Sequence, residues 1–417
     1  MGEWGNYMNE KYLIINGGSS SLKASLYEMP NGLELANVYV EKIGYDDSFY
    51  TIKYNGVKQK KEVYVKDHTT AVRLLLTELI EKGVVSDLNE IRGVGHRVLH
   101  GGEIYSTSVI VDEDVINNIE ALTKLGPLHH PGEIAGILSV KKYLPNAVNV
   151  AVFDTAFHQT MPKENYLYAV PYEWYKENGV RKYGFHGTSH NYITDEMKKR
   201  YLKNDVNLII CHIGSGASIA CVKEGKCYDT TMGLTPLDGL VMGTRSGSID
   251  PSILGYICNE RNLTIDEVTN ILNKKSGLLG LSGKNDLRDV ELLASEGNDL
   301  AKLAIDKMEK SVEDTIAKYY LELNGNVDAL VFTAGVGENS SKFRKDVINY
   351  IKPLGVSVNE SINDEIAGFK EIKSGKISTD DSAFDILVIP TDEEYMILKD
   401  TYKLSNLDKA KVYKKIK

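Results

Sequence analysis

Two Gly/Ser turns, each enclosed by apolar runs, constrain the fold of this chain more than any other feature. The first turn lies in YLIINGGSSSLKASL, residues 12–26, and the second in LIICHIGSGASIACV, residues 208–222. In each segment an apolar run enters the turn and a second apolar run leaves it, which predicts a strand, a tight turn and a strand. Because the two hairpins share this design, we expect two related lobes that face one cleft.

The composition of the two turns favours the binding of an anion. Glycine permits close approach of the backbone and serine adds a hydroxyl with little bulk, so successive N–H groups can face a phosphate. Lys23 adds a positive charge just beyond the first turn, although the order of residues differs from that of a P-loop. Either turn taken alone is equally compatible with an ordinary hairpin turn. The presence of two such turns in one chain favours a functional role in binding an anion.

Length, composition and charge exclude several classes of protein. A chain of 417 residues exceeds the usual size of one hydrophobic core, so we expect two domains. No apolar run approaches the roughly 20 residues of a membrane helix. The N-terminal sequence MGEWGNYMNEK has no signal-peptide pattern, so we expect it to form a loose extension and the protein to be cytoplasmic. The net charge of −9 argues against a general nucleic-acid binder. Four cysteines without CxxC spacing favour reduced core thiols.

The order of the predicted elements indicates an α/β protein. Predicted strands alternate with predicted helices in both halves of the chain. The predicted strands are 12–16, 22–27, 62–65, 93–99, 148–154, 208–222 (the second hairpin), 328–334 and 384–389, and the predicted helices are 69–82, 299–323 and the Lys-rich C-terminal stretch. We place the boundary near residues 154–162, so that 1–154 with 395–417 form an N-terminal lobe and 155–394 form a C-terminal lobe.

Candidate functional residues of the first half lie where predicted strands end. Arg97 lies at the end of a predicted buried strand and suits a carboxylate or phosphate, although a structural ion pair is an equal alternative. In the loop LGPLHHP we favour His129 as an anion contact, Leu128 as part of an apolar pocket and His130 as a structural residue, with no metal. Asp154 ends another strand, where α/β proteins place ligands, and it can orient a metal-bound water or cap the following segment.

The second half supplies three further segments. His186 lies between an aromatic ring and a glycine in YGFHGTSH, where a positioned imidazole can stabilise negative charge. Arg245 lies inside a glycine-framed loop, where a surface role is hard to justify. The segment FTAGVGEN, residues 332–339, combines a strand with a glycine turn and fits a contact to adenosine or an α-phosphate at a helix start.

These segments, in this order, resemble the acetate kinase family of acetate and propionate kinases, within the actin, Hsp70 and sugar-kinase superfamily. The motifs that carry the resemblance are INGGSSSLK, HRVLHGGE, VAVFDTAFHQTMP, YGFHGTSH, MGLTPLDGLVMGTR, SGLLGLSG, VFTAGVGENS and IPTDEE. The resemblance spans residues 12–401 and implies a two-lobed, duplicated actin-like (ribonuclease H-like) ATPase fold with a central cleft. It implies reversible phosphoryl transfer from ATP to a short-chain carboxylate, giving an acyl phosphate and ADP.

The resemblance also assigns roles to residues. The first phosphate loop is implied to consist of Asn16, Ser19, Ser21 and Lys23. The carboxylate and its alkyl tail are implied to contact Arg97, Leu99, Leu128, His129, Phe185 and Pro236. The catalytic groups are implied to be Arg97, Asp154, His186 and Arg245, and the metal ligands for Mg²⁺, with Mn²⁺ as an alternative, Asn16 and Glu393. The nucleotide contacts are implied to be His212, Ile213, Gly214, Ser215, Gly216, Asp286, Leu287, Arg288, Gly335, Val336, Gly337, Glu338 and Asn339.

The resemblance leads to one principal hypothesis and several alternatives. The principal hypothesis is an ATP-dependent acetate kinase that acts as a homodimer, with acetate and ATP as substrates and no nucleic-acid or membrane partner. Propionate kinase is the nearest alternative, because one methylene changes selectivity by only about 1 to 3 kcal/mol. A superfamily ATPase that works as a binding protein, a relative that uses pyrophosphate, and a degenerate paralogue remain as further alternatives.

The chain departs from the family pattern at four places, and two of these departures, Ser215 and Ser248, motivate the degenerate alternative. The second phosphate loop has Ser215 where Asn is common, and the loop after Arg245 has Ser248 where Asp is usual. The segment 129–133 reads HHPGE in place of the common HNPxN, and the segment 284–286 is one residue short. Ser215 offers a shorter hydroxyl than an amide, so the degenerate alternative predicts recovery of activity on Ser215→Asn.

Overall fold

The structure is a computed structural model that describes residues 10–127, 129–368 and 373–415, with side chains described as far as residue 407. Within this part of the chain, two compact units are formed. The first unit consists of the residues up to Ala156 together with those from Asp392 onward, and the second consists of Phe157–Thr391. Leu128 and the N-terminal extension up to residue 9 lie outside the described residues.

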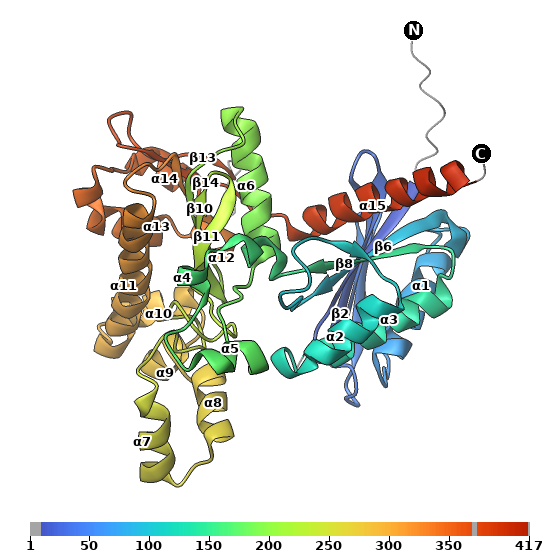
Figure 1. Ribbon diagram of the computed structural model, residues 1–417, viewed down its shortest axis with the longest axis horizontal. Coiled ribbons are helices and arrows are strands. Elements are labelled where there is room, and N and C mark those ends of the chain that lie inside the picture. The colour runs from blue at the N-terminus through green and yellow to red at the C-terminus, as the bar shows by residue number, and fades with distance from the viewer. Residues whose placement is uncertain (1–9, 128, 369–372, 416–417) are drawn as a thin grey trace. The chain divides into compact units, whose positions relative to one another are not determined.

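The first unit is built on an eight-stranded sheet with the order β5-β4-β3-β2-β1-β6-β8-β7 (Figure 1). Its strands are β1 (Glu10–Gly17), β2 (Ser21–Met29), β3 (Leu33–Glu41), β4 (Phe49–Tyr54), β5 (Val57–Glu62), β6 (Ile91–Val98), β7 (Val109–Ile110) and β8 (Val148–Phe153). Strands β1 to β5 pair antiparallel in succession, whereas β1, β6 and β8 run parallel to one another. The carboxyl ends of these three parallel strands therefore lie at the same edge of the sheet.

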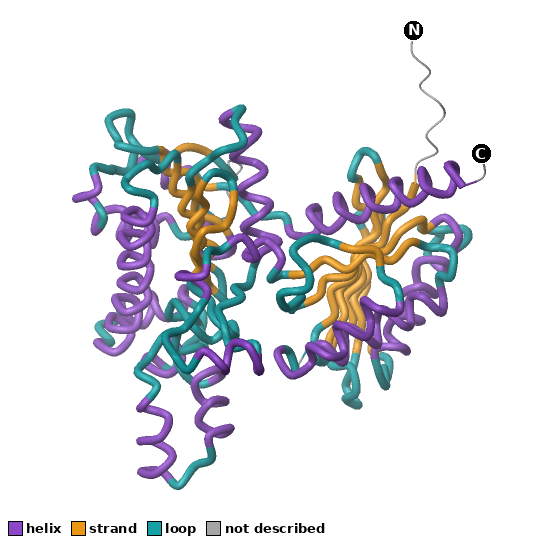
Figure 2. Tube along the Cα trace, in the orientation of Figure 1, coloured by secondary structure: helices purple, strands orange, loops and turns teal. Residues whose placement is uncertain are grey.

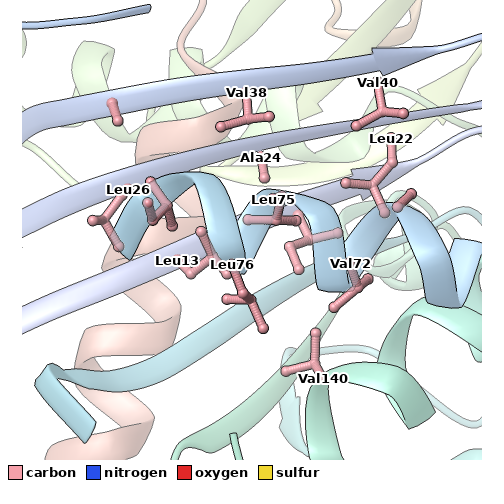
Figure 3. Close-up of a cluster of buried hydrophobic side chains, with 14 of the residues drawn as sticks. Leu13, Leu22, Ala24, Leu26, Val38, Val40, Val72, Leu75, Leu76 and Val140 are labelled. Carbon is pink, nitrogen blue, oxygen red and sulfur yellow. The ribbon is translucent and has the colours of Figure 1, made fainter. Parts of the chain in front are cut away.

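Helices cover both faces of this sheet. The helices are α1 (His68–Glu81), α2 (Glu113–Ala121), α3 (His130–Tyr143) and α15 (Glu393–Lys415), with short 3-10 helices η1 (Leu88–Glu90) and η2 (Leu122–Leu125). Side chains of a strand alternate between faces, so Leu13 and Ile15 pack toward α1 and α3, and Tyr12 and Ile14 pack toward α15. Figure 3 shows the first of these clusters, which includes Leu13, Leu22, Ala24, Leu26, Val38, Val40, Val72, Leu75, Leu76 and Val140.

The second unit repeats the arrangement of the first. Its six-stranded sheet has the order β11-β10-β9-β12-β14-β13. The strands are β9 (Leu208–Ile213), β10 (Ala217–Lys223), β11 (Lys226–Thr230), β12 (Ala329–Thr333), β13 (Gly375–Lys376) and β14 (Asp385–Val388). Strands β11, β10 and β9 form an antiparallel meander, and β9, β12 and β14 are parallel. The order β11-β10-β9-β12-β14 matches β3-β2-β1-β6-β8, which confirms the predicted duplication.

Helices of the second unit are more numerous. They are α4 (Lys163–Tyr166), α5 (Tyr172–Asn178), α6 (Gly187–Tyr201), α7 (Ser252–Arg261), α8 (Ile265–Lys274), α9 (Gly277–Ser282), α10 (Leu287–Ser295), α11 (Asp299–Glu322), α12 (Ala334–Asn339), α13 (Ser341–Tyr350), α14 (Glu360–Glu365) and the 3-10 helices η3 (Ala156–Thr160, which begins in the first unit) and η4 (Lys352–Leu354). Ile193 and Met197 of α6 pack on Leu208 and Val331 of the sheet. Helix α11 contacts β9 and β10, and Figure 2 shows it as the long helix beside this sheet.

Most predicted elements are confirmed to within one or two residues, and one is wrong. Residues 62–65 were predicted as a strand, but pairing ends at Glu62, the last residue of β5. Val65 is fully buried without strand pairing, so its apolar character reflects packing against the core. Strands β3 and β4 were not predicted.

Cys211, Cys221 and Cys227 are free and buried, as predicted, and Cys258 is partly exposed. Among the described residues, none of the helices has both the length and the apolar character needed to span a membrane.

Candidate active site

The first Gly/Ser turn joins β1 to β2 and is closed by its own backbone. The N–H of Gly18 donates to the carbonyl of Ser21 at 2.8 Å, and Ser19 is exposed in the turn. The imidazole Nε2 of His68, at the start of α1, lies 2.7 Å from the carbonyl oxygen of Gly18 and holds the turn from outside. Sequence analysis did not identify His68. Its position directly after Asp67, the N-cap of α1, is an ordinary helix start and gave no functional signal.

Lys23 is not a free cation in this unit. Its ammonium forms an ion pair with the carboxylate of Glu394, at the start of α15. The same carboxylate accepts hydrogen bonds from Ser25 Oγ at 2.7 Å and from Tyr27 Oη at 2.9 Å. These interactions hold the pKa of Glu394 below its usual range against the opposing effect of burial, so the Lys23 charge is partly neutralised before any ligand binds.

Arg97 and Asp154 meet at the carboxyl ends of β6 and β8. Because these strands are parallel and Arg97 pairs with Val152, Asp154 follows directly beside it. Arg97 Nε donates to Asp154 Oδ1 at 3.2 Å, and Nη2 contacts Oδ2, so the pair is bidentate. Arg97 Nη1 donates to Asn16 Oδ1 at 3.2 Å. The Arg97 side chain is 19% exposed, and its guanidinium is held in one orientation by these contacts.

Glu133 adds a second buried carboxyl to this region. Its Oε1 accepts the backbone N–H of Leu99 at 3.1 Å, whereas its Oε2 has no hydrogen-bond partner among the described residues. Burial raises the pKa of Glu133 to about 8, with Asp154 adding to the rise and Arg97 opposing it. Leu99 is buried, as expected for an apolar pocket. Glu133 was not predicted as a functional residue from the segment HHPGE, because its burial depends on strands distant in the sequence.

The two histidines of this loop differ in setting. His130 is fully buried, and its Nδ1 lies 3.1 Å from the carbonyl oxygen of Ile119, which agrees with the predicted structural role. His129 is the residue before α3, and its N–H donates to the carbonyl of Gly126 at 3.1 Å. The predicted pocket residue Leu128 lies outside the described residues.

Glu393 and Asp154 form a pair of neighbouring carboxyl groups suited to a cation. Burial and the neighbouring Asp154 together raise the pKa of Glu393 to about 7, against the opposing effect of Arg97. One arginine thus faces several acidic groups, and the excess negative charge fits a divalent cation with oxygen ligands. The predicted metal ligand Asn16 uses its Oδ1 to accept from Arg97 in this arrangement. The described residues contain no cluster of three or more His, Cys, Asp or Glu residues with metal-binding geometry.

In the second unit, His186 and Arg245 converge on the second Gly/Ser turn. A methyl group placed on Gly216 would lie 3.4 Å from Arg245 Nη1 and 3.5 Å from His186 Nε2. Arg245 Nη1 also donates to the carbonyl of Pro236 at 3.2 Å, and burial lowers the pKa of Arg245. The N–H of Gly214 donates to the carbonyl of Gly216 at 3.1 Å, which shapes the turn. Two nitrogen donors therefore face the point where glycine leaves room for an anion.

His186 itself has an unusual backbone. Its φ of +57° is left-handed, a conformation rare for a residue with a side chain, and it immediately precedes α6. Its Nδ1 lies 3.0 Å from Ser218 Oγ, and its ring stacks on His212 with centroids 4.2 Å apart. Phe185 is buried beside it. Backbone strain of this kind persists only where the surroundings hold it.

A cavity of about 510 Å³ lies beside the same turn. It is lined by Gly214, Ser215, Gly243, Leu278, Asn285, Asp286, Leu287, Arg288, Glu291, Met308, Gly335, Val336, Asn339, Ser340 and Gly368. Eight of the predicted nucleotide contacts are among these residues, and its size suits a nucleoside. Arg288, 83% exposed, forms an ion pair with Asp286 at 2.6 Å.

Five of the predicted nucleotide contacts do not line this cavity: His212, Ile213, Gly216, Gly337 and Glu338. Glu338 Oε1 accepts the N–H of Ala334 at 2.7 Å and that of Thr391 at 3.1 Å. The carbonyls of Gly337 and Glu338 each accept from Arg344 Nη1 at 2.9 Å, and Arg344 is fully buried. Glu338 therefore shapes the turn, while its neighbours Gly335, Val336 and Asn339 line the cavity.

The Ser248 departure is accommodated by a short hydrogen bond within its loop. Ser248 Oγ donates to Asp238 Oδ1 at 2.6 Å and accepts the N–H of Gly239 at 3.0 Å. Ser215, the other serine departure, is exposed at the mouth of the cavity, and its carbonyl accepts the N–H of Gly243 at 3.3 Å.

Comparison with known proteins assigns this arrangement to a family. The model of the acetokinase family matches residues 11–399. An acetate kinase of Bacillus subtilis (strain 168) is 49% identical over 399 residues, covering 95% of this chain and 99% of that protein. The crystal structure of Porphyromonas gingivalis acetate kinase aligns with a TM-score of 0.90 and 41% identity over 95% of this chain and 99% of that one. A propionate kinase from Francisella tularensis subsp. tularensis SCHU S4 aligns with a TM-score of 0.88 and 41% identity, over 95% of this chain and 100% of that one.

Proposed function

The chain belongs to the acetokinase family, and on this premise we propose that it is an ATP-dependent acetate kinase. It transfers the terminal phosphoryl group of ATP to acetate, giving acetyl phosphate and ADP, and it catalyses the reverse reaction. The observation that carries this proposal is the convergence of His186 and Arg245 on Gly216, beside a cavity of nucleotide size. The bidentate Arg97–Asp154 pair supplies the group that suits the acid substrate.

The carboxylate substrate is bound through Arg97. Acetate is already ionised at pH 7, so no general base is needed, and catalysis consists of bringing two anions together and neutralising the moving phosphoryl group. Asp154 orients the guanidinium, which is the role that its bidentate contact supports. Of the residues that the resemblance assigns to the methyl group, Leu99 is buried in the first unit and Phe185 in the second.

His186 and Arg245 would stabilise the phosphoryl group as charge spreads over its oxygens. Groups of this kind are typically worth about 10²-fold or more in rate. Arg97→Ala and Arg245→Ala should therefore each be nearly inactive while the protein stays folded. The predicted nucleotide residues that line the cavity would hold the nucleoside.

The acidic residues of the first unit fit a magnesium ion. Glu393 and Asp154 would hold it, with Asn16 nearby. Burial and the neighbouring Asp154 raise the pKa of Glu393, and a bound cation would favour its ionised form. Such an ion neutralises the charge of the ATP phosphates. Mn²⁺ has the same preference for oxygen ligands and is the alternative.

A hydroxamate assay tests the proposal and separates it from its alternatives. Purified protein is incubated with Mg-ATP and hydroxylamine, together with acetate, propionate, butyrate or no acid. We expect an acetate-dependent signal. A stronger signal with propionate would identify a propionate kinase, the function named for one structural relative. Nucleotide binding with no signal from any acid would contradict the proposal in favour of a degenerate or non-catalytic protein, and Ser215→Asn would then be tested for recovery.

We further propose that the protein is cytoplasmic and, as the family resemblance implies, a homodimer. Helix α7, all of whose residues the structure describes, buries none of them, and its Tyr256 is 65% exposed. Exposed apolar residues of this kind are available for contact with a second copy. Light scattering coupled to size-exclusion chromatography should give twice the chain mass of 46.4 kDa, and a mass equal to one chain would contradict the proposal.

A further inference from the structure

Four histidines of the second unit lie together behind the Gly216 turn. The rings of His186 and His212 are stacked at 4.2 Å, those of His158 and His190 lie 5.6 Å apart, and those of His190 and His212 lie 6.1 Å apart. His158, His190 and His212 are each at least 93% buried. Burial lowers the pKa of His158 and of His212 to about 4 and lowers that of His190 well below its usual range. These three rings are therefore neutral at pH 7.

A single serine joins two of these rings. Ser218 Oγ lies 2.8 Å from His190 Nε2 and 3.0 Å from His186 Nδ1, and Ser218 is fully buried on β10. A hydroxyl has one proton and can donate to only one of the two ring nitrogens. Ser218 Oγ has no third hydrogen-bond partner among the described residues, so accepting from both rings would leave its own buried proton without an acceptor. It therefore donates to one ring and accepts from the other. The direction of this relay determines which nitrogen of His186 carries a proton.

His190 fixes the direction. Its Nδ1 is buried and has no hydrogen-bond partner among the described residues. A proton on this nitrogen would leave a buried N–H donor unsatisfied, which is more costly than an unsatisfied acceptor of a neutral ring. The proton of His190 is therefore on Nε2, from which it donates to Ser218 Oγ. Ser218 then donates to Nδ1 of His186, and the remaining position for the proton of His186 is Nε2.

The backbone and the ring face of His186 are fixed by the other two histidines. His158 Nε2 lies 2.9 Å from the carbonyl oxygen of Phe185, and because a carbonyl only accepts, this nitrogen is the donor. The bond restrains the peptide directly before His186, whose φ is left-handed. His212 stacks on the ring of His186, and its own Nδ1 is held by Ser189 Oγ at 2.7 Å.

We propose that Ser218 and His190 are positioning residues that hold His186 as a neutral imidazole with its proton on Nε2, directed at the transferred phosphoryl group. The inference rests on the proposed function, because it assigns a role in phosphoryl transfer to His186. Nε2 is the ring nitrogen on the edge that faces Gly216, beside Arg245 Nη1. A neutral N–H donor there can contact a phosphoryl oxygen without adding a second positive charge next to the guanidinium. If Nδ1 of His186 carried the proton, it would donate to Ser218 Oγ, and Ser218 would donate to Nε2 of His190. The proton of His190 would then lie on its buried Nδ1, which has no hydrogen-bond partner among the described residues.

The first test is a direct measurement of the proton positions. Long-range ¹H–¹⁵N correlation spectra of protein labelled with ¹⁵N in its nine histidines distinguish the two neutral tautomers and the charged ring. The His186 signals are those lost in His186→Gln. We expect Nε2 protonated and Nδ1 unprotonated near pH 7. A protonated Nδ1, in either a neutral or a charged ring, would overturn the proposal, and this readout does not depend on activity.

The second test compares Ser218→Ala in two backgrounds. In the wild-type background we expect kcat for acetyl phosphate formation to fall by about 10-fold, with the KM for ATP within about two-fold, since an oriented donor is lost. The glutamine of His186→Gln can place an amide N–H near the position of Nε2. An amide has no alternative tautomer, so its donor does not depend on a hydrogen bond from Ser218. In that background Ser218→Ala should therefore cause no further loss. An equal loss in both backgrounds would mean that Ser218 is merely structural.

A matched control addresses the loss of a buried atom. The control variant is Cys221→Ala. Cys221 lies on the same strand β10 and is as fully buried as Ser218. Its side chain faces the other side of the sheet, because the two positions are an odd number of residues apart. We expect wild-type kcat for this variant. If Ser218→Ala does not fold, the wild-type spectrum still decides the proposal. If the wild-type protein has no kinase activity, the proposed function fails independently of the tautomer result.

Discussion

Glu133→Gln should change how the stability of the first unit depends on pH. The Glu133 side chain is 4% exposed, and burial raises its pKa to about 8. Glutamine has nearly the same shape and is neutral at every pH, and its carbonyl oxygen can still accept the N–H of Leu99. The variant therefore removes the titration and keeps the one hydrogen bond that Glu133 makes through Oε1.

The sign and magnitude follow from proton linkage. The pKa of glutamate is about 4.3 in an unfolded chain, so between that pH and about 8 the folded protein keeps a proton that the unfolded chain has released. The stabilisation is complete below the unfolded value and is lost as pH rises through the folded value. The free energy of unfolding of the wild type, relative to Glu133→Gln, should fall by about 3 kcal/mol between pH 5 and pH 8 and then level off.

Hydrogen exchange at several pH values measures this difference in one unit at a time. Peptides that cover β6 report on the first unit, and peptides that cover β9 report on the second and serve as an internal control. Exchange rates must be corrected for the intrinsic effect of pH, and urea denaturation at each pH gives an independent value. If the two proteins show parallel stability profiles from pH 5 to pH 8, then Glu133 does not hold a proton in the folded state, and the reasoning from its burial is refuted.

Three further predictions concern the second unit and the metal. Gly216→Ala places a methyl group 3.4 Å from Arg245 Nη1 and 3.5 Å from His186 Nε2, so kcat should fall by about 10-fold or more in a folded protein; a kcat within two-fold of the wild type would contradict the site. Arg344→Met leaves the carbonyls that its guanidinium binds without a donor, so urea denaturation should show a loss of about 3 kcal/mol or more, and an unchanged midpoint would argue against this role. EDTA should abolish acyl phosphate formation, and added Mg²⁺ or Mn²⁺ should restore it; full activity in EDTA would exclude the metal site proposed at Glu393.

The sequence was informative wherever a local pattern decides the structure. The two hairpins, the helix at 299–323, the buried strand that contains Arg97 and the buried strand that precedes Asp154 all consist of apolar residues bounded by turn or cap signals, and each is found within one or two residues. Strand β5 was missed because all of its side chains are exposed, so no apolar periodicity marks it. The preceding strands β3 and β4 were missed as well, although each buries side chains at alternate positions.

The sequence by itself determined the duplicated α/β design and the types of residue at the strand ends, because both depend on patterns a few residues long. Only the tertiary structure decided which of these residues meet. Arg97 and Asp154 are 57 positions apart and become a bidentate pair through the parallel register of β6 and β8. The burial of Glu133 and the relay through Ser218 likewise depend on distant segments that exclude water. Register and burial are properties of the folded chain as a whole, and no short stretch of sequence encodes them.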